Sequence, residues 1–129
     1  MKRTLLALLS LGFGLFIIAK PILAHHSEAA EYDPTKPVKV TGTIKTVEWK
    51  NPHVWFYVDV KDESGKVTTW GFSTSPPGML LRRGITKEVF KIGAVINVEG
   101  SQARDGSHNA TGRKVTFADG RNVIAAPSE

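Results

Sequence analysis

The stretch HVWFYVDV, His53 to Val60, constrains the fold more than any other part of the chain. Every second residue from Val54 to Val60 is apolar, and this period of two is typical of a β-strand with one buried face. KDESGK follows as a turn, and VTTWGFS, residues 67–73, has the composition of a returning antiparallel strand. The sequence therefore predicts a β-hairpin.

Three more strands are expected around this hairpin. Residues 38–49 alternate well enough for a long first strand, and Gly42 within it indicates a bulge or sharp bend. Residues 93–100, GAVINVEG, predict a fourth strand. The segment 113–125 predicts a fifth strand, a tight turn at Asp119-Gly120 and a short returning segment.

Between the hairpin and the fourth strand the pattern changes to a helical one. Ser75 and Pro76-Pro77 favour a helix start, Gly84 favours its end, and a second short helical turn is expected from Thr86. Three strands, a helical connection and two strands follow the order of an OB-fold. The predicted fold is therefore all-β with a short helical connection, an OB-fold-like five-stranded barrel over residues 38–126. A different small β-barrel or sandwich with a helical crossover is the alternative.

Residues 1–24 have the layout of a cleavable signal peptide. Lys2 and Arg3 precede an apolar segment of 15 residues, Leu5 to Ala19, and Ala24 fits the position before cleavage. As a helix the segment would measure about 22 Å, against roughly 30 Å for a bilayer core. We therefore predict a periplasmic or secreted protein without a stable membrane anchor after cleavage. A retained amphipathic or membrane-anchored end is the alternative.

Cleavage would also change the charge of the chain. It removes Lys2, Arg3 and Lys20 and no acidic residue, which leaves 14 basic residues against 12 acidic ones, a formal net charge of +2. From this small charge on an exported protein we expect no nucleic-acid partner. Residues 25–37, which contain two X-Pro pairs, are expected to form an extended N-terminal arm.

The histidine pair at the start of this arm predicts a metal site. The chain has no cysteine, which excludes disulfides and thiolate ligands. Cleavage after Ala24 would give His25 a free amine beside its imidazole, and His26 or His53 would add a third nitrogen in a geometry that suits Cu(II). Adventitious metal binding by two histidines on a flexible arm is the alternative.

An OB-fold directs attention to one face and its rims. Ligands usually lie across strands two and three, beside the loops that join strands one to two and four to five. Each of these two loops contains a histidine, His53 in one and His108 in the other. The candidate ligand-binding residues are Asn51, Trp55, Tyr57 and Trp70, and the candidate metal ligands are His25, His26, His53 and His108.

The sequence contains no recognisable catalytic constellation. Ser27 lies near histidines, but nothing assigns it a base or an oxyanion hole. We expect a non-enzymatic binding domain for a small ligand or a metal ion, with copper as the candidate cofactor. The rivals are a copper-dependent redox enzyme built on His25, His26 and His53, and a structural module that pairs with another periplasmic protein.

Four stretches of the chain resemble a known family: AHHS, VEWKNPHVWFYVDV, LLRRG and GAVINVEG. The family consists of small exported bacterial proteins with a domain of unknown function, and the similarity runs from His25 to about Ile124. The resemblance implies a periplasmic β-barrel-like domain and brings no established activity. Glu28 and Ala94 depart from the family pattern, in which an aromatic or apolar residue and an acidic residue are frequent at these positions.

Overall fold

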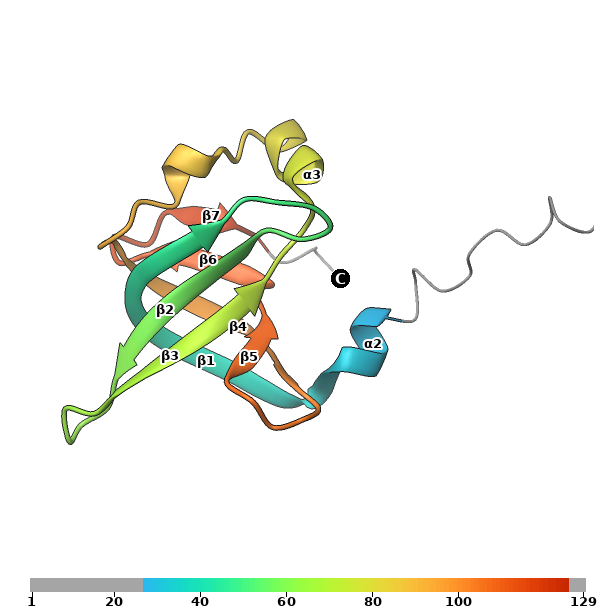
Figure 1. Cartoon of the computed structure of the whole chain (residues 1–129). Coiled ribbons are helices and arrows are strands. Elements are labelled where there is room, and N and C mark those ends of the chain that lie inside the picture. The colour runs from blue at the N-terminus through green and yellow to red at the C-terminus, as the bar shows by residue number, and fades with distance from the viewer. Residues whose placement is uncertain (1–26, 126–129) are drawn as a thin grey trace, which may run out of the picture.

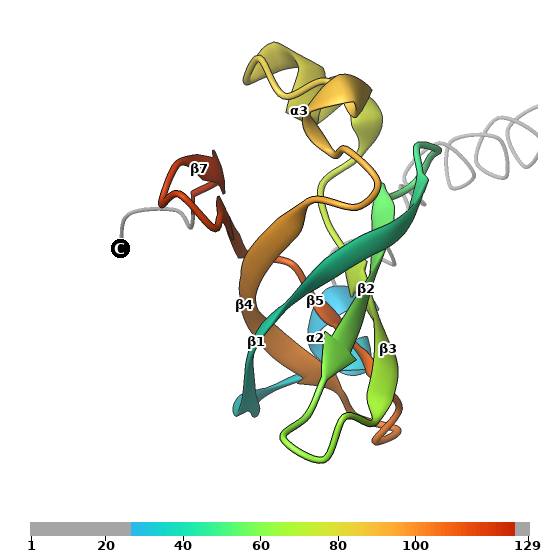
Figure 2. The same ribbon diagram turned by 90° about the vertical axis from the view of Figure 1, so that its left-hand side faces the viewer.

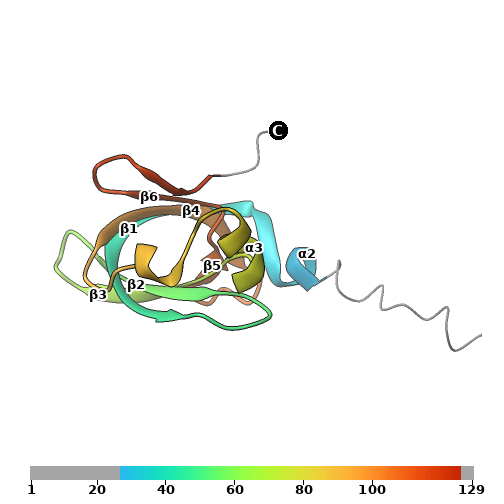
Figure 3. The ribbon, with the colours of Figure 1, turned by 90° about the horizontal axis from the view of Figure 1, so that it is seen from above.

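The computed structural model describes residues 27–125, and the predicted signal peptide and the histidine pair His25-His26 lie outside them. The chain is organised around a sheet of seven strands in the order β1-β2-β3-β5-β4-β6-β7. Because β1 also pairs with β4, the strands β1, β2, β3, β5 and β4 form a closed ring (Figure 3). This is an all-β architecture with a short helical connection, as the sequence predicts. Within residues 27–125, no helix has the length and apolar character needed to cross a membrane.

The first strand makes the ring possible because it is long enough to pair on two sides. β1 runs over Tyr32–Glu48, and its first part pairs with β4 (Val95–Ala103) while its last part pairs with β2 (Trp55–Lys61). The turn of β1 from one partner to the other is visible in Figure 2. A Cβ at Gly42 would lie 2.5 Å from the carbonyl oxygen of Asp59, so only glycine permits this close approach. The register shift itself falls between Ile44 and Thr46, just beyond the predicted position.

The predicted hairpin is confirmed. β2 pairs with β3 (Val67–Ser73) in antiparallel register, with Phe56 opposite Phe72. Both phenylalanines are fully buried and their rings stack at 5.4 Å, and Phe56 stacks on Phe90 at the same centroid distance. The alternation in the sequence thus identifies the residues at the centre of the core.

The helical connection covers one end of the ring. α3 (Pro77–Arg82) and the 3-10 helix η2 (Lys87–Val89) belong to the connection from β3 to β4 and lie over that end of the ring (Figures 1 and 3). Leu80 of α3 is fully buried in the core. Gly84 ends the helical segment with a φ of 74°, as predicted, whereas the N-cap is Pro76 and not Ser75.

The fifth strand of the ring differs from the predicted one. β5 is the three-residue segment Asn109–Thr111, which lies parallel to β3 and antiparallel to β4. The segment predicted as the fifth strand forms β6 (Lys114–Phe117) and β7 (Asn122–Ile124), which extend the sheet from β4 outside the ring. The turn between them falls at Asp119-Gly120, as predicted, with a φ of 86° at Gly120.

The predicted extended arm is helical where the structure begins. α2 occupies Ser27–Glu31, and residues 32–37 already belong to β1. The backbone amide of Arg104 donates to the carbonyl oxygen of Glu31 at 2.8 Å, and the Arg104 Nε donates to the carbonyl oxygen of Ala29 at 3.1 Å. These two bonds hold the short helix against the end of β4, which is why it does not extend away as an arm.

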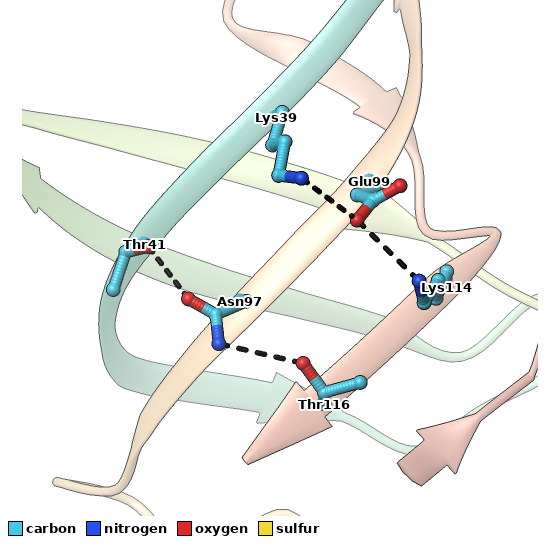
Figure 4. Close-up of polar contacts among 6 residues, drawn as sticks. All are labelled: Lys39, Thr41, Asn97, Glu99, Lys114 and Thr116. Atoms are coloured by element: carbon cyan, nitrogen blue, oxygen red, sulfur yellow. Dashed lines mark hydrogen bonds and ion pairs between the residues drawn. The ribbon is translucent and has the colours of Figure 1, made fainter. Parts of the chain in front are cut away.

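The outer side of β1, β4 and β6 carries two rows of polar contacts (Figure 4). Asn97 is at the centre of one row and Glu99 at the centre of the other. Asn97 bonds to Thr41 at 2.6 Å and Thr116 at 3.4 Å, and Glu99 pairs with Lys39 at 3.3 Å and Lys114 at 3.7 Å. Exposed pairs of this kind contribute little stability individually. They make this side of the molecule a polar, solvent-facing surface.

Candidate functional site

An open cavity of about 580 Å³ lies where α2 meets the ring. Its walls come from α2, the starts of β1 and β2, the end of β3, α3, the β5–β6 connection and the end of β7. Apolar side chains, charges of both signs and hydroxyl groups all contribute. The lining residues used below are Glu28, Glu31, Tyr32, His53, Trp55, Ser73, Met79, Arg83 and Arg113.

His53 stands at the edge of this cavity with one ring nitrogen already engaged. Its Nδ1 lies 2.8 Å from the carbonyl oxygen of Thr74. Because a carbonyl can only accept, Nδ1 carries the proton and the lone pair of the neutral ring is on Nε2. The amide and hydroxyl of Thr74 both donate to the carbonyl oxygen of Val54, at 2.9 and 3.0 Å, so the acceptor is itself fixed. The imidazole is therefore oriented as a metal-ligating or proton-accepting histidine is, by a bond to its second nitrogen.

Tyr32 lines the cavity, and its hydroxyl is a buried polar group that is closed off from solvent. Its side chain is 4% exposed, and its hydroxyl has no hydrogen-bond partner among residues 27–125. Burial, followed by the negative charge of Glu31, raises the pKa of Tyr32 to about 12. Ser73 and Glu31 lie near the hydroxyl, but neither bonds to it with acceptable geometry. A buried donor without an acceptor costs about 1–3 kcal/mol, and native proteins keep few such groups without a reason.

The charges around the cavity are balanced. Glu28 of α2 pairs with Arg113 of the β5–β6 connection at 3.7 Å, and both side chains are more than half exposed. Glu31 and Arg83 also line the cavity, and neither makes an ion pair within the described part of the chain. Two carboxylates thus face two guanidinium groups, so the cavity has no net charge to select an anion or a cation.

Trp55 and Tyr57 form an aromatic pair on the outer face of β2. Their rings stack with centroids 6.3 Å apart and planes inclined by 20°. Opposite Tyr57 on β3 is Gly71, where a Cβ would approach the Tyr57 ring to 3.1 Å. The glycine therefore keeps this face flat beside the ring. Trp55 also lines the cavity, so the aromatic pair continues the cavity wall onto the outer sheet face.

Trp70 and His108 do not join this face. Trp70 is opposite Val58 and shares the inner face of β3 with Phe72, so it packs against the core. His108 contacts the Trp70 ring edge-on, with centroids 5.0 Å apart, and is not among the residues that line the cavity. The structure thus places His53 at the cavity and His108 beside Trp70, outside the cavity wall. Asn51 is exposed in the bend before β2 and also lies apart from the cavity wall.

The two N-terminal histidines lie outside residues 27–125, so the predicted three-histidine site is seen only in part. Among the described residues, no group of three or more histidine, aspartate or glutamate side chains is arranged to hold a metal ion. Sequence reasoning also missed Tyr32, which it placed in the arm. A single aromatic residue in the polar segment SEAAEYDPTKP was the available signal, because an aromatic side chain there needs a place to be buried.

The fold is similar to that of a single-stranded DNA binding protein. The crystal structure of the mitochondrial protein Rim1 from S. cerevisiae matches with a TM-score of 0.51 and 10% identity, over 68% of this chain and 95% of that chain. A crystal structure of selenomethionine-labelled Rim1 gives a TM-score of 0.48 and 11% identity, over 71% and 97% of the two chains. At this identity the likeness shows the fold alone, which is OB-fold-like.

Residues 14–114 match DUF6152, a family of proteins of unknown function, and the chain belongs to this family. The family resemblance seen in the sequence is thereby confirmed. No curated protein matches the chain by sequence.

The structural comparison corrects one prediction. Nucleic acid was excluded as a partner because the mature chain would carry a net charge of only +2, yet the matched structure is that of a DNA-binding protein. The prediction that excluded nucleic acid was wrong, because it was argued from the net charge alone. Binding to a polyanion depends on where charges and stacking surfaces lie, and a total over the whole chain does not report that distribution.

Proposed function

We propose that this chain is a periplasmic, non-enzymatic binding domain that holds copper with His53 and the histidine pair His25-His26. The observation that carries the proposal is the orientation of His53. Its Nδ1 is bonded to the carbonyl oxygen of Thr74, so Nε2 is free to ligate at the edge of the cavity. A ligating histidine usually donates its other ring N–H in this way.

Chain connectivity supports the second half of the proposed site. The cavity is walled by α2, which begins at Ser27, directly after the histidine pair. Consecutive α-carbons are about 3.8 Å apart, so His26 starts within one residue of the helix and His25 within two. The amine released by signal cleavage and the imidazole of His25, with a further nitrogen from His26 or His53, form a ligand set that suits Cu(II).

The test is a Cu(II) titration of the protein processed to begin at His25. We expect one equivalent to bind with micromolar or tighter affinity, and His53→Ala and His25→Ala each to weaken binding about tenfold or more. The matched control is His108→Ala, an exposed histidine beside Trp70 and away from the cavity. If His53→Ala binds copper as tightly as the parent protein, the histidine pair acts alone and the shared site does not exist.

The rival enzyme hypothesis uses the same three histidines and differs in its readout. A copper-dependent redox enzyme would consume oxygen or produce peroxide when the copper-loaded protein is given a reductant. The binding-domain proposal expects rates equal to those of the same concentration of free copper. Oxygen-electrode measurements on parent and His53→Ala proteins separate the two.

A second candidate function is binding of single-stranded nucleic acid. The observation in its favour is the stacked pair Trp55 and Tyr57 on the outer face of β2, because aromatic rings on an OB-fold sheet are platforms on which bases stack. Fluorescence anisotropy with a labelled oligothymidine tests it. Salt-dependent binding that Tyr57→Ala weakens would support this candidate, and equal anisotropy with and without protein would reject it.

A further inference from the structure

The proposed copper site gives the buried hydroxyl of Tyr32 no role, because this hydroxyl is not among the proposed metal ligands. It is a donor without an acceptor among the described residues, in a side chain that is 96% buried. With its pKa near 12 it keeps its proton at every physiological pH. A ligand that brings an acceptor oxygen to this position would remove the cost of the unpaired donor.

The remaining walls indicate the shape of such a ligand. Trp55 offers an aromatic ring at the cavity, and Met79 of α3, 39% exposed, offers a polarizable thioether from another part of the wall. Both kinds of side chain favour contact with a flat ring. The volume of about 580 Å³ is within the range of sites for small organic molecules.

The charges of the cavity favour a neutral ligand. Glu28 is paired with Arg113, and Glu31 lies close enough to Tyr32 to raise its pKa. A carboxylate placed against the Tyr32 hydroxyl would therefore meet the negative charge of Glu31. A carbonyl oxygen accepts the same hydrogen bond without that repulsion. The hydroxyl is closed off from solvent, so a ligand reaches it only when a neighbouring side chain moves, and the exposed side chain of Glu31 lies beside it.

We propose that the cavity where α2 meets the ring binds a small neutral aromatic molecule that carries a carbonyl oxygen, with the oxygen accepting from the Tyr32 hydroxyl and the aromatic ring in contact with Trp55 and Met79. This goes beyond the copper proposal, since it needs neither the histidine pair nor the Nε2 of His53. The two can succeed or fail separately.

The experiment pairs two probes that differ in one group. Acetophenone and ethylbenzene have the same ring and nearly the same shape, and only acetophenone has an acceptor. Binding to the whole chain is followed by NMR chemical-shift changes in the presence of EDTA, which removes any contribution of a metal. We expect acetophenone to bind with a Kd on the order of 1 mM, as fragments of this size do, and to shift resonances of Tyr32 and Trp55.

Tyr32→Phe should weaken acetophenone binding about two- to tenfold, because that is the effect of losing one neutral hydrogen bond. The same substitution should leave ethylbenzene binding unchanged. Tyr57→Phe, a hydroxyl deletion outside the cavity wall, is the matched control and should change neither. Benzoate should bind more weakly than acetophenone. Equal acetophenone affinity in parent protein and Tyr32→Phe, or tighter binding of benzoate, would overturn the proposal. Because EDTA is present throughout, a failed copper titration has no bearing on this result.

Discussion

Deleting the hydroxyl of Tyr32 should make the protein more stable, although most substitutions of buried residues do the reverse. The Tyr32 side chain is 4% exposed and its hydroxyl has no partner within residues 27–125. Tyr32→Phe keeps the ring and its packing and removes only the unpaired group. The cost of an unsatisfied buried donor is about 1–3 kcal/mol, and we expect a gain near the lower end, about 1 kcal/mol, because the neighbouring Ser73 offers partial polar compensation.

Urea unfolding measures this gain directly. For a domain of this size a gain of about 1 kcal/mol raises the melting temperature by roughly 4–8 °C, and it moves the urea midpoint upward by about 0.5 M. Tyr57→Phe removes a hydroxyl from the outer face of β2 and should stay within about 0.5 kcal/mol of the parent protein. A destabilised Tyr32→Phe would mean that the hydroxyl is hydrogen-bonded in solution. Both the energetic cost assigned to the hydroxyl and the ligand inferred from it would then be refuted.

Two further predictions concern pH and backbone packing. The pKa of Tyr32 is about 12 in the folded chain against an ordinary value of 10.0. The unfolded chain therefore loses this proton first, and stability falls as pH rises from 10 to 12, by roughly 2–3 kcal/mol in full. Urea midpoints across this range should show the loss in the parent protein and a smaller one in Tyr32→Phe, and parallel curves would contradict it. At Gly100 a Cβ would lie 1.6 Å from the carbonyl oxygen of Thr111, so Gly100→Ala should lower the free energy of unfolding by at least about 3 kcal/mol through overpacking. In the control variant Gly78→Ala the new Cβ meets nothing closer than 3.8 Å, and its stability should be unchanged or higher by up to about 1 kcal/mol. Equal melting temperatures for the two variants would refute the steric argument.

The sequence predicts the parts of the fold that rest on local patterns. The hairpin of β2 and β3 follows from strict alternation and a turn, and the helical connection follows from Pro76-Pro77 and Gly84. β5 could not be predicted in this way. It is three residues long in a turn-rich segment, and it exists because tertiary packing places Ala110 between β3 and β4.

The candidate site was predictable only where the same patterns apply. His53, Trp55 and Tyr57 were identified, and the structure brings the first two to one cavity. The inward direction of Trp70 was available from the sequence, since it is two residues from Phe72 and must share its face. The position of Tyr32 at the cavity was not, because it depends on pairing with Ala103 of β4, about 70 residues away in the chain.

The double pairing of β1 has a consequence for the order in which the chain can assemble. Its first half has no partner until β4 exists, since Tyr32 pairs with Ala103 and Val38 with Gly100. Until β4 is available to pair, the strand made first has an open edge. Lys36, Pro37 and Lys39 lie along that edge, and lysine and proline are residues that discourage strands of separate molecules from joining. We therefore expect the segment whose later pairing closes the ring to discourage aggregation of the chain before that pairing forms.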